Sequence, residues 1–265
     1  MAAPLTREPD PQAHRKRLLA AASEWGIFEG MRRPWLTVGL LVGLVAIHLS
    51  LGLRMWSNDR IGPIGVLLAR RPKALLERAG GQSAPEIDAG ELWRLISCVF
   101  LHQDGLHILL NGLALFGLGR LCESIYGRAR LLLLFVLSGL GGSSLSYLGG
   151  TELSVGASGA VFGLLAAPIV FGWRFREELP TEIGRALRLR LIPWAVLNLL
   201  IGALIPFIDN LAHLGGLLAG AALAAVLSPP VVPGNEGHPW AGRLMVLGVG
   251  GLLAWAAVGV SGNWL

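Results

Sequence analysis

The chain has 265 residues, of which 53% are hydrophobic and 15% are charged, and its mean hydropathy is +0.60. A soluble domain carries about 25% charged residues, so this composition excludes a soluble globular protein and favours a polytopic helical membrane protein. The net charge of +5 is small and the arginines cluster in loops, which argues against nucleic-acid binding.

The N-terminal segment, residues 1–34, is polar and mixed in charge, and we predict that it is cytoplasmic. Its longest apolar stretch, Leu18–Ala22, is too short for the h-region of a signal peptide. Glu8 and Asp10 argue against a transit peptide, because such peptides are poor in acidic residues.

Seven long apolar runs follow, and each is a candidate membrane helix. In chain order they are about Trp35–Leu53, Leu106–Leu121, Leu131–Leu148, Ser158–Trp173, Leu191–Phe207, Leu211–Leu227 and Leu244–Val260. The predicted fold class is therefore an all-α polytopic membrane protein. The chain shows no internal sequence repeat, which argues against an inverted-repeat transporter.

The first two runs are joined by a long stretch, about Arg54–Gly105. It contains an apolar piece, Leu92–Leu101, that is too short to span a bilayer and is predicted to be re-entrant or interfacial.

Arginines in alternate loops predict the orientation, because positively charged short loops remain in the cytoplasm. The stretches predicted to be cytoplasmic are residues 1–34, the region of Arg128 and Arg130, and Arg174–Arg190. The opposite loops, Gly149–Val155 and Ile208–Asn210, contain no Lys or Arg. The first loop also has basic residues, but its length weakens their effect on orientation.

This topology brings polar residues from three helices to one membrane depth, just below the outer surface. His107 and Asn111 lie in the first turns of the second segment, Ser158 opens the fourth, and His213 lies in the first turn of the sixth. Chance placement would scatter such residues between the two faces. An ionisable residue inside a membrane segment is a functional candidate, because it is energetically expensive there.

Ser158 and His213 have the chemistry of a nucleophile and its base. A serine hydroxyl attacks well only when a base takes its proton, and an imidazole with a pKa of about 6.5 is suited to do so. Backbone N–H groups at a helix N-terminus can stabilise the developing oxyanion. Each residue also has a simpler alternative: Ser158 could belong to a packing face with Gly159 and Gly163, and His213 could be a buried core histidine.

The roles of the remaining polar residues are less specifically indicated by the sequence. His107 and Asn111 are spaced i, i+4 on one helix face, where they could donate to the oxyanion or make a hydrogen bond within or between helices. Asp209, with Asn210, is predicted to cap the sixth segment and not to complete a catalytic triad. His48 lies in the first segment without a matching partner and is predicted to be structural.

His102, in the apolar piece of the first loop, is a candidate member of the outer polar network. Cys98 and Cys122 lack the spacing of a metal site, and we do not expect a disulfide between them.

Four ordered motifs resemble those of the rhomboid family of intramembrane serine proteases. They are E-L-W-R at Glu91–Arg94, H-Q-D-G-L-H-I-L-L-N ending at Asn111, G-A-S-G at Gly156–Gly159, and A-H-L-G-G-L-L-A-G ending at Gly220. The match covers roughly residues 90–225. It implies a six-helix rhomboid core in residues 35–228, then a linker and one C-terminal transmembrane helix in residues 229–265.

The resemblance also implies residue roles. Ser158 and His213 would form the catalytic dyad, and the oxyanion hole would consist of His107, Asn111 and the Ser158 backbone N–H. Glu123 would have a structural role at the inner end of the second segment. Phe162 departs from the family, which often has a tyrosine at this position with its ring packed on the histidine.

The implied function is that of an intramembrane serine endopeptidase without metal or cofactor. Its expected partners are single-pass or other transmembrane protein substrates and the lipid bilayer, with no nucleic acid, and its expected location is the bacterial plasma (inner) membrane. The alternative is a non-proteolytic rhomboid-like protein that binds transmembrane clients. Such pseudoenzymes typically lack the serine or the histidine, whereas this chain keeps both.

Overall fold

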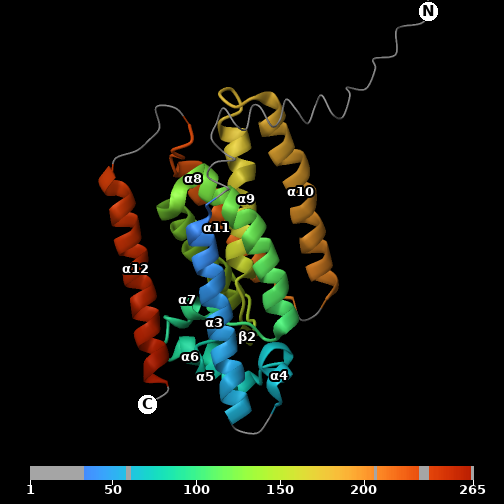
Figure 1. Cartoon of the computed structure of the whole chain (residues 1–265), viewed down its shortest axis with the longest axis vertical. Helices are drawn as coiled ribbons and strands as arrows, with labels where there is room; N and C mark the ends of the chain where they lie inside the picture. Colours follow the sequence, from blue (N-terminus) through green and yellow to red (C-terminus); the bar gives the residue numbers. More distant parts are fainter. Residues whose placement is uncertain (1–32, 58–60, 206–207, 233–238, 264–265) are drawn as a thin grey trace, which may run out of the picture.

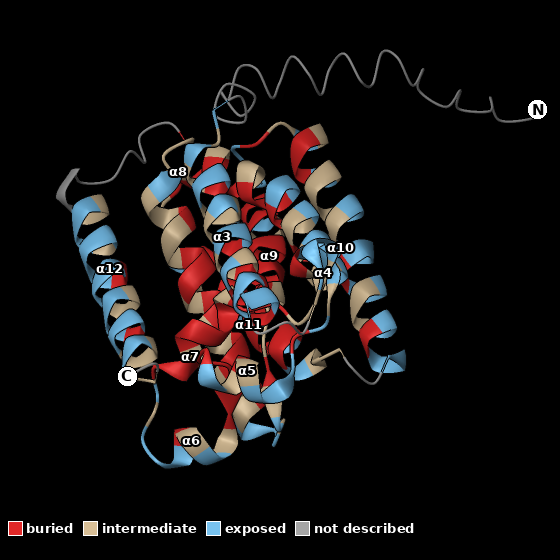
Figure 2. Cartoon of the chain, turned by 60° about the horizontal axis from the view of Figure 1, so that its bottom comes forward, coloured by how far each residue is buried: buried red, intermediate tan, exposed pale blue. Residues whose placement is uncertain are grey.

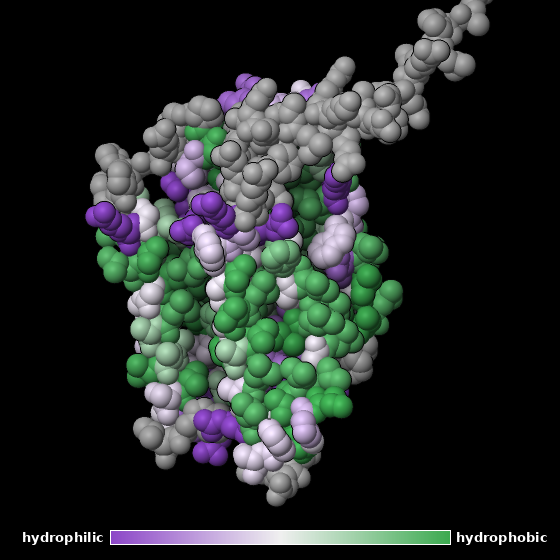
Figure 3. Space-filling model, in the orientation of Figure 1, coloured by the Kyte–Doolittle hydropathy of each residue, from purple (hydrophilic) through white to green (hydrophobic). Residues whose placement is uncertain are grey.

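The computed structural model describes residues 33–57, 61–205, 208–232 and 239–263, which form a bundle of helices along one common direction (Figure 1). Most of the predicted N-terminal segment, residues 1–34, lies outside the described residues. On the face seen in Figure 3, hydrophobic side chains cover the middle of the bundle and polar side chains lie toward its two ends.

The long helices correspond to the predicted membrane segments. They are α3 (Trp35–Ser57), α8 (Gly105–Leu148), α9 (Ser158–Arg174), α10 (Thr181–Leu204), α11 (Asn210–Val226) and α12 (Pro239–Gly262). Among the described residues, four helices are long and apolar enough to cross a membrane, and α9 and α11 are shorter apolar helices. The predicted class, an all-α polytopic membrane protein, is confirmed.

Two differences from the predicted segments are the largest. The second and third segments are parts of α8, which turns at Gly127, where φ is +73°, a conformation that glycine adopts without steric cost. The predicted start of the fifth segment, Leu191, is wrong, because α10 already begins at Thr181. Hydropathy identifies only the apolar part of a helix. The first ten residues of α10, before its apolar part, include the helix formers Arg, Ala and Leu.

The first loop folds into short elements beside one end of the bundle. In chain order they are α4 (Pro63–Leu68), α5 (Lys73–Arg78), β1 (Gln82–Ser83), α6 (Ala84–Asp88), α7 (Arg94–Ser97) and the 3-10 turn η1 (Cys98–Phe100). Strand β1 pairs antiparallel with β2 (Leu153–Ser154), with Gln82 opposite Ser154. The loop is thereby tied to the segment that immediately precedes α9.

Arg94 of the E-L-W-R motif orders this loop from the inside. Its buried guanidinium donates from Nε to Glu91 Oε2 at 2.7 Å and also donates to the Gly81 carbonyl at 3.1 Å and to the Glu77 carbonyl. The guanidinium also lies over the Trp93 ring, 4.8 Å from its centroid. One charged side chain therefore connects three separate positions of an otherwise irregular stretch.

A second buried arginine holds the loop to α3. The side chain of Arg71 lies 3.1 Å from His48 Nε2 and donates to the His48 carbonyl at 3.1 Å and to the Val66 carbonyl at 2.7 Å. The expectation that His48 has no matching partner is therefore wrong. Its partner lies in the long first loop, where no periodic sequence pattern links it to the helix.

The centre of the bundle is built where α9 and α11 meet, with α8 packed against both (Figure 2). A Cβ atom at Gly216 would lie 1.9 Å from the Gly159 carbonyl oxygen, and one at Gly220 would lie 2.3 Å from the Gly163 Cα atom. Only glycine permits this backbone-to-backbone contact. The paired positions increase together along both helices, so α9 and α11 run parallel.

Glu123 occupies a buried position near the start of α3. Its carboxylate accepts hydrogen bonds from the Leu36 N–H at 3.1 Å, from the Thr37 N–H at 2.9 Å and from the Thr37 hydroxyl at 2.7 Å. The first N–H groups of a helix have no partner within the helix. Glu123 on α8 supplies these partners for α3, which is the kind of structural role that the resemblance implies.

We therefore expect Glu123→Ala to destabilise the protein by roughly 3 kcal/mol, because it leaves buried donors without acceptors. Thermal unfolding in detergent should show a lower Tm for Glu123→Ala and a smaller decrease for Glu123→Gln, which keeps one acceptor oxygen. Exposed Glu177 provides a control position, at which Glu177→Ala should leave the Tm unchanged. Equal Tm values for the Glu123→Ala variant and the wild type would contradict the proposed role.

Candidate active site

Ser158 and His213 lie at corresponding ends of the two central parallel helices. Ser158 is the first residue of α9, and His213 is in the first turn of α11. A Cβ atom at Gly159, directly after Ser158, would lie 3.1 Å from the carbonyl oxygen of Ala212, directly before His213. The neighbours of the two predicted catalytic residues are thus in contact across the helix pair.

The imidazole of His213 is packed against an aromatic ring. Phe162, one turn after Ser158, stacks on the imidazole with ring centroids 4.2 Å apart and planes inclined by 17°. Nδ1 of His213 is buried, and no hydrogen-bond partner for it occurs in the part of the chain that the structure describes. The expected contact between Phe162 and His213 is therefore present.

Asp209 caps α11, as predicted. Its carboxylate accepts from the Ala212 N–H at 3.0 Å, and its second oxygen accepts from the hydroxyls of Ser154, at 2.6 Å, and Ser146. Because the described residues offer no hydrogen-bond partner to Nδ1 of His213, Asp209 does not complete a triad with it. The two serine partners come from β2 and α8, so this carboxylate joins three parts of the chain beside the candidate site.

His107 lies against the segment that leads into Ser158. A Cβ atom at Gly156 would be only 2.7 Å from His107 Nε2, and Gly156 has a φ of +128°. Glycine is therefore required here both for the backbone conformation and for the close approach of the imidazole. The N–H of His107 donates to Asp104 Oδ1 at 2.8 Å, which caps the start of α8.

Asn111 lies one turn further along α8 and is buried. Its Nδ2 atom donates to the His107 carbonyl at 3.0 Å, which is one of the alternatives left open by the sequence. A primary amide has two N–H donors, so this hydrogen bond leaves one of them available.

His102 belongs to the same network, although the sequence indicated it only weakly. Its ring lies edge-on to His107 at a centroid distance of 5.1 Å, and its Nε2 atom accepts from the Ala157 N–H at 3.5 Å. Burial, followed by the charges of His107 and His48, lowers the pKa of His102 to about 3. The imidazole is therefore neutral at physiological pH and can act as this acceptor.

The stacked ring leads to a prediction about Phe162. Phe162→Leu should keep much of the buried volume but lose the flat surface against His213, and we expect turnover to fall about a hundredfold, the scale of an effect from misplacing a catalytic group. Phe162→Tyr keeps the ring and should be tolerated, whereas Phe162→Ala should lower activity more than stability. Turnover and thermal unfolding of the three variants provide the test, and full activity in both Phe162→Leu and Phe162→Ala would contradict a positioning role.

The chain is similar to known proteins over the region that carries the candidate site. The family model described as the Rhomboid domain matches residues 89–230. The chain is 42% identical to RHOMBOID-like protein 5 of Arabidopsis thaliana, covering 57% of this chain and 49% of that protein. It is 36% identical to Rhomboid protease GluP of Bacillus subtilis, covering 57% of this chain and 29% of that protein.

A further relative is Rhomboid protease AarA of Providencia stuartii, which is 34% identical over 53% of this chain and 58% of that protein. The chain thus spans less than two thirds of the length of each of these relatives. Residues 89–230, which the family model matches, include α9 and α11.

Proposed function

The chain belongs to the rhomboid family, and from this premise we propose that it is an intramembrane serine endopeptidase that cleaves transmembrane proteins in or near their membrane segment. Ser158 attacks the scissile carbonyl, and His213 first takes the serine proton and then gives it to the leaving amine. His107, Asn111 and the Ser158 N–H stabilise the oxyanion. The reaction requires no metal or cofactor.

The observation that carries the proposal is the contact between Gly159 on α9 and the Ala212 carbonyl on α11. These residues adjoin Ser158 and His213, so this packing supports a nucleophile and a base at one depth. Ser158 begins its helix, and its N–H is one of the first four, which lack intrahelical acceptors. Such a donor can turn toward an oxyanion without breaking a helical hydrogen bond.

The substrates are single-pass or other transmembrane proteins that reach the site from the lipid bilayer. A continuous helix occupies its carbonyl groups in internal hydrogen bonds, which hides them from a nucleophile. Substrates with small or helix-breaking residues near the cleavage site should therefore be preferred.

The protein is an integral multi-pass membrane protein. We propose a bacterial plasma (inner) membrane, with residues 1–34 in the cytoplasm, residues 35–228 as the rhomboid core, and residues 229–265 as the linker and seventh helix. The arginines of Arg174–Arg190, which extend from the end of α9 into α10, and the absence of Lys and Arg from Gly149–Val155 support this orientation.

The orientation makes a prediction for reporter fusions. A reporter fused after Arg185 should be active as a cytoplasmic fusion, one fused after Thr151 should be active as an external fusion, and the C-terminus should be external. Paired reporters that work on opposite sides of the membrane give the readout. The inverse pattern would place Ser158 near the inner face and contradict the proposed orientation.

Proteolysis by the purified full-length chain is the direct test. The protein is reconstituted into liposomes with a single-pass model substrate, and cleavage is followed on gels, with reaction of the serine with a fluorophosphonate as a second readout. Cleavage near the substrate's membrane segment is expected. Binding of the substrate without cleavage or serine labelling would favour the alternative, a non-proteolytic rhomboid-like protein that binds transmembrane clients.

A further inference from the structure

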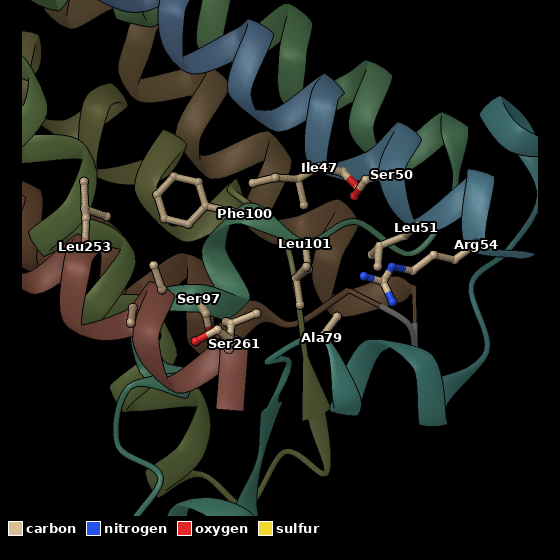
Figure 4. Close-up of a pocket in the computed structure, with 13 residues that line it drawn as sticks. Ile47, Ser50, Leu51, Arg54, Ala79, Ser97, Phe100, Leu101, Leu253 and Ser261 are labelled. Carbon is tan, nitrogen blue, oxygen red and sulfur yellow. The ribbon is translucent and has the colours of Figure 1, made fainter. Parts of the chain in front are cut away.

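A cavity of about 450 Å³ lies between α3, the end of the first loop and α12 (Figure 4). The α3 wall includes Leu51 and Arg54, the loop wall includes Phe100 and Leu101, and the α12 wall includes Leu253 and Ala257. None of its lining residues in the described chain belongs to α9 or α11, so this cavity is separate from the candidate active site.

The cavity lies in the half of the bundle that contains the start of α9. Its walls come from the C-terminal halves of α3 and α12, which end at the same end of the bundle as β2 and the first loop (Figure 1). Leu101 in the cavity wall precedes His102, whose imidazole accepts from the Ala157 N–H. The end of the loop therefore contacts the cavity through Leu101 and the segment before Ser158 through His102.

The lining is mainly apolar, and the two helices that contribute to it, α3 and α12, are long and apolar enough to cross a membrane. An empty apolar space loses the dispersion contacts that its walls could make, and the bilayer core holds no water to fill it. In a membrane, the apolar chain available to occupy such a space is a lipid acyl chain.

A charged residue beside the cavity indicates the headgroup that such a lipid would carry. Arg54 is the one charged residue among those lining the cavity in the described chain, and it lies in the last turn of α3. Figure 4 shows its side chain extending from the helix among the lining residues. A guanidinium at the end of a membrane helix reaches the headgroup level and binds phosphate oxygens through paired N–H donors.

We propose that this cavity binds an anionic phospholipid of the leaflet on the Ser158 side, with one acyl chain between α3 and α12 and its phosphate on Arg54. The hydroxyls of Ser50 and Ser261 each donate to a carbonyl of their own helix, at 2.7 Å in both cases. Hydroxyl groups carry no charge, so Arg54, the one charged residue among the lining residues of the described chain, is the residue that discriminates lipids by headgroup charge. The site does not depend on proteolytic activity, and its test uses binding alone.

The test titrates delipidated full-length protein in detergent with dioleoylphosphatidylglycerol or dioleoylphosphatidylcholine and counts bound lipids by native mass spectrometry. Ala257→Phe places a ring in the cavity from an exposed position, and Ala254→Phe adds the same ring to α12 outside the lining. Arg54→Gln removes the cation, and Arg70→Gln is its control in the first loop, also outside the lining.

We expect Ala257→Phe to weaken binding of both lipids about tenfold, and Arg54→Gln to weaken only phosphatidylglycerol by about tenfold, the scale of one lost charge-assisted hydrogen bond. The two controls should bind as the wild type does. Thermal unfolding verifies that each variant is folded, and Ala257→Leu replaces Ala257→Phe if the larger ring prevents folding. Unchanged binding in the cavity variants, equal losses in the controls, or equal affinity of the wild type for both lipids would overturn the proposal.

Discussion

Replacing either Ser158 or His213 by alanine is expected to abolish cleavage while the protein stays folded. The nucleophile and its base act as one unit, and in a soluble serine protease the loss of either lowers kcat about a millionfold. We expect a loss of at least about 10⁴-fold for each variant, and the double variant should be no slower than the single ones. Turnover of a single-pass substrate in liposomes measures the effect.

Ser124→Ala is the matched control for the serine. Its hydroxyl donates to the Leu121 carbonyl of its own helix at 2.7 Å, and it lies in α8 near the Gly127 turn. This variant should cleave substrate at the wild-type rate and keep its reaction with a fluorophosphonate, whereas Ser158→Ala should lose both. Full activity of Ser158→Ala would show that the protease assignment is wrong.

Replacing Asn111 by alanine is expected to slow cleavage about a hundredfold to a thousandfold, the scale for one oxyanion-hole donor. One amide N–H of Asn111 is occupied by the His107 carbonyl, and the second can donate to the oxyanion. Residual activity should remain, because the Ser158 N–H and His107 are still present. The decrease should appear in kcat and not in KM, since the oxyanion forms only as the reaction proceeds.

Asn198→Ala is a close control for this variant. Nδ2 of Asn198 donates to the carbonyl of Trp194 in α10 at 2.8 Å, the same i to i−4 hydrogen bond that Asn111 makes with His107. If loss of this bond alone explained the effect, both variants would change to the same extent. An unchanged rate in Asn111→Ala would show that the residue has only a packing role.

By itself the sequence determined the membrane class, the number of apolar segments and the starts of the central helices. The helix that begins at Ser158 and the cap at Asp209 followed from local signals, namely a polar residue directly before or at the start of an apolar run. The close-packing role of the glycines of α11 could also be predicted from the sequence, because their spacing of four residues places them on one helix face.

Only the tertiary structure decided which distant residues meet. The pairing of β1 with β2, the contact of Arg71 with His48, and the bonds from Ser146 and Ser154 to Asp209 join stretches that no sequence period relates. Buried polar groups need partners, but the chain alone does not specify which of the many candidates each one finds. At the candidate site, glycines allow close backbone contact between α9 and α11, and in this packing Gly159 lies against the Ala212 carbonyl.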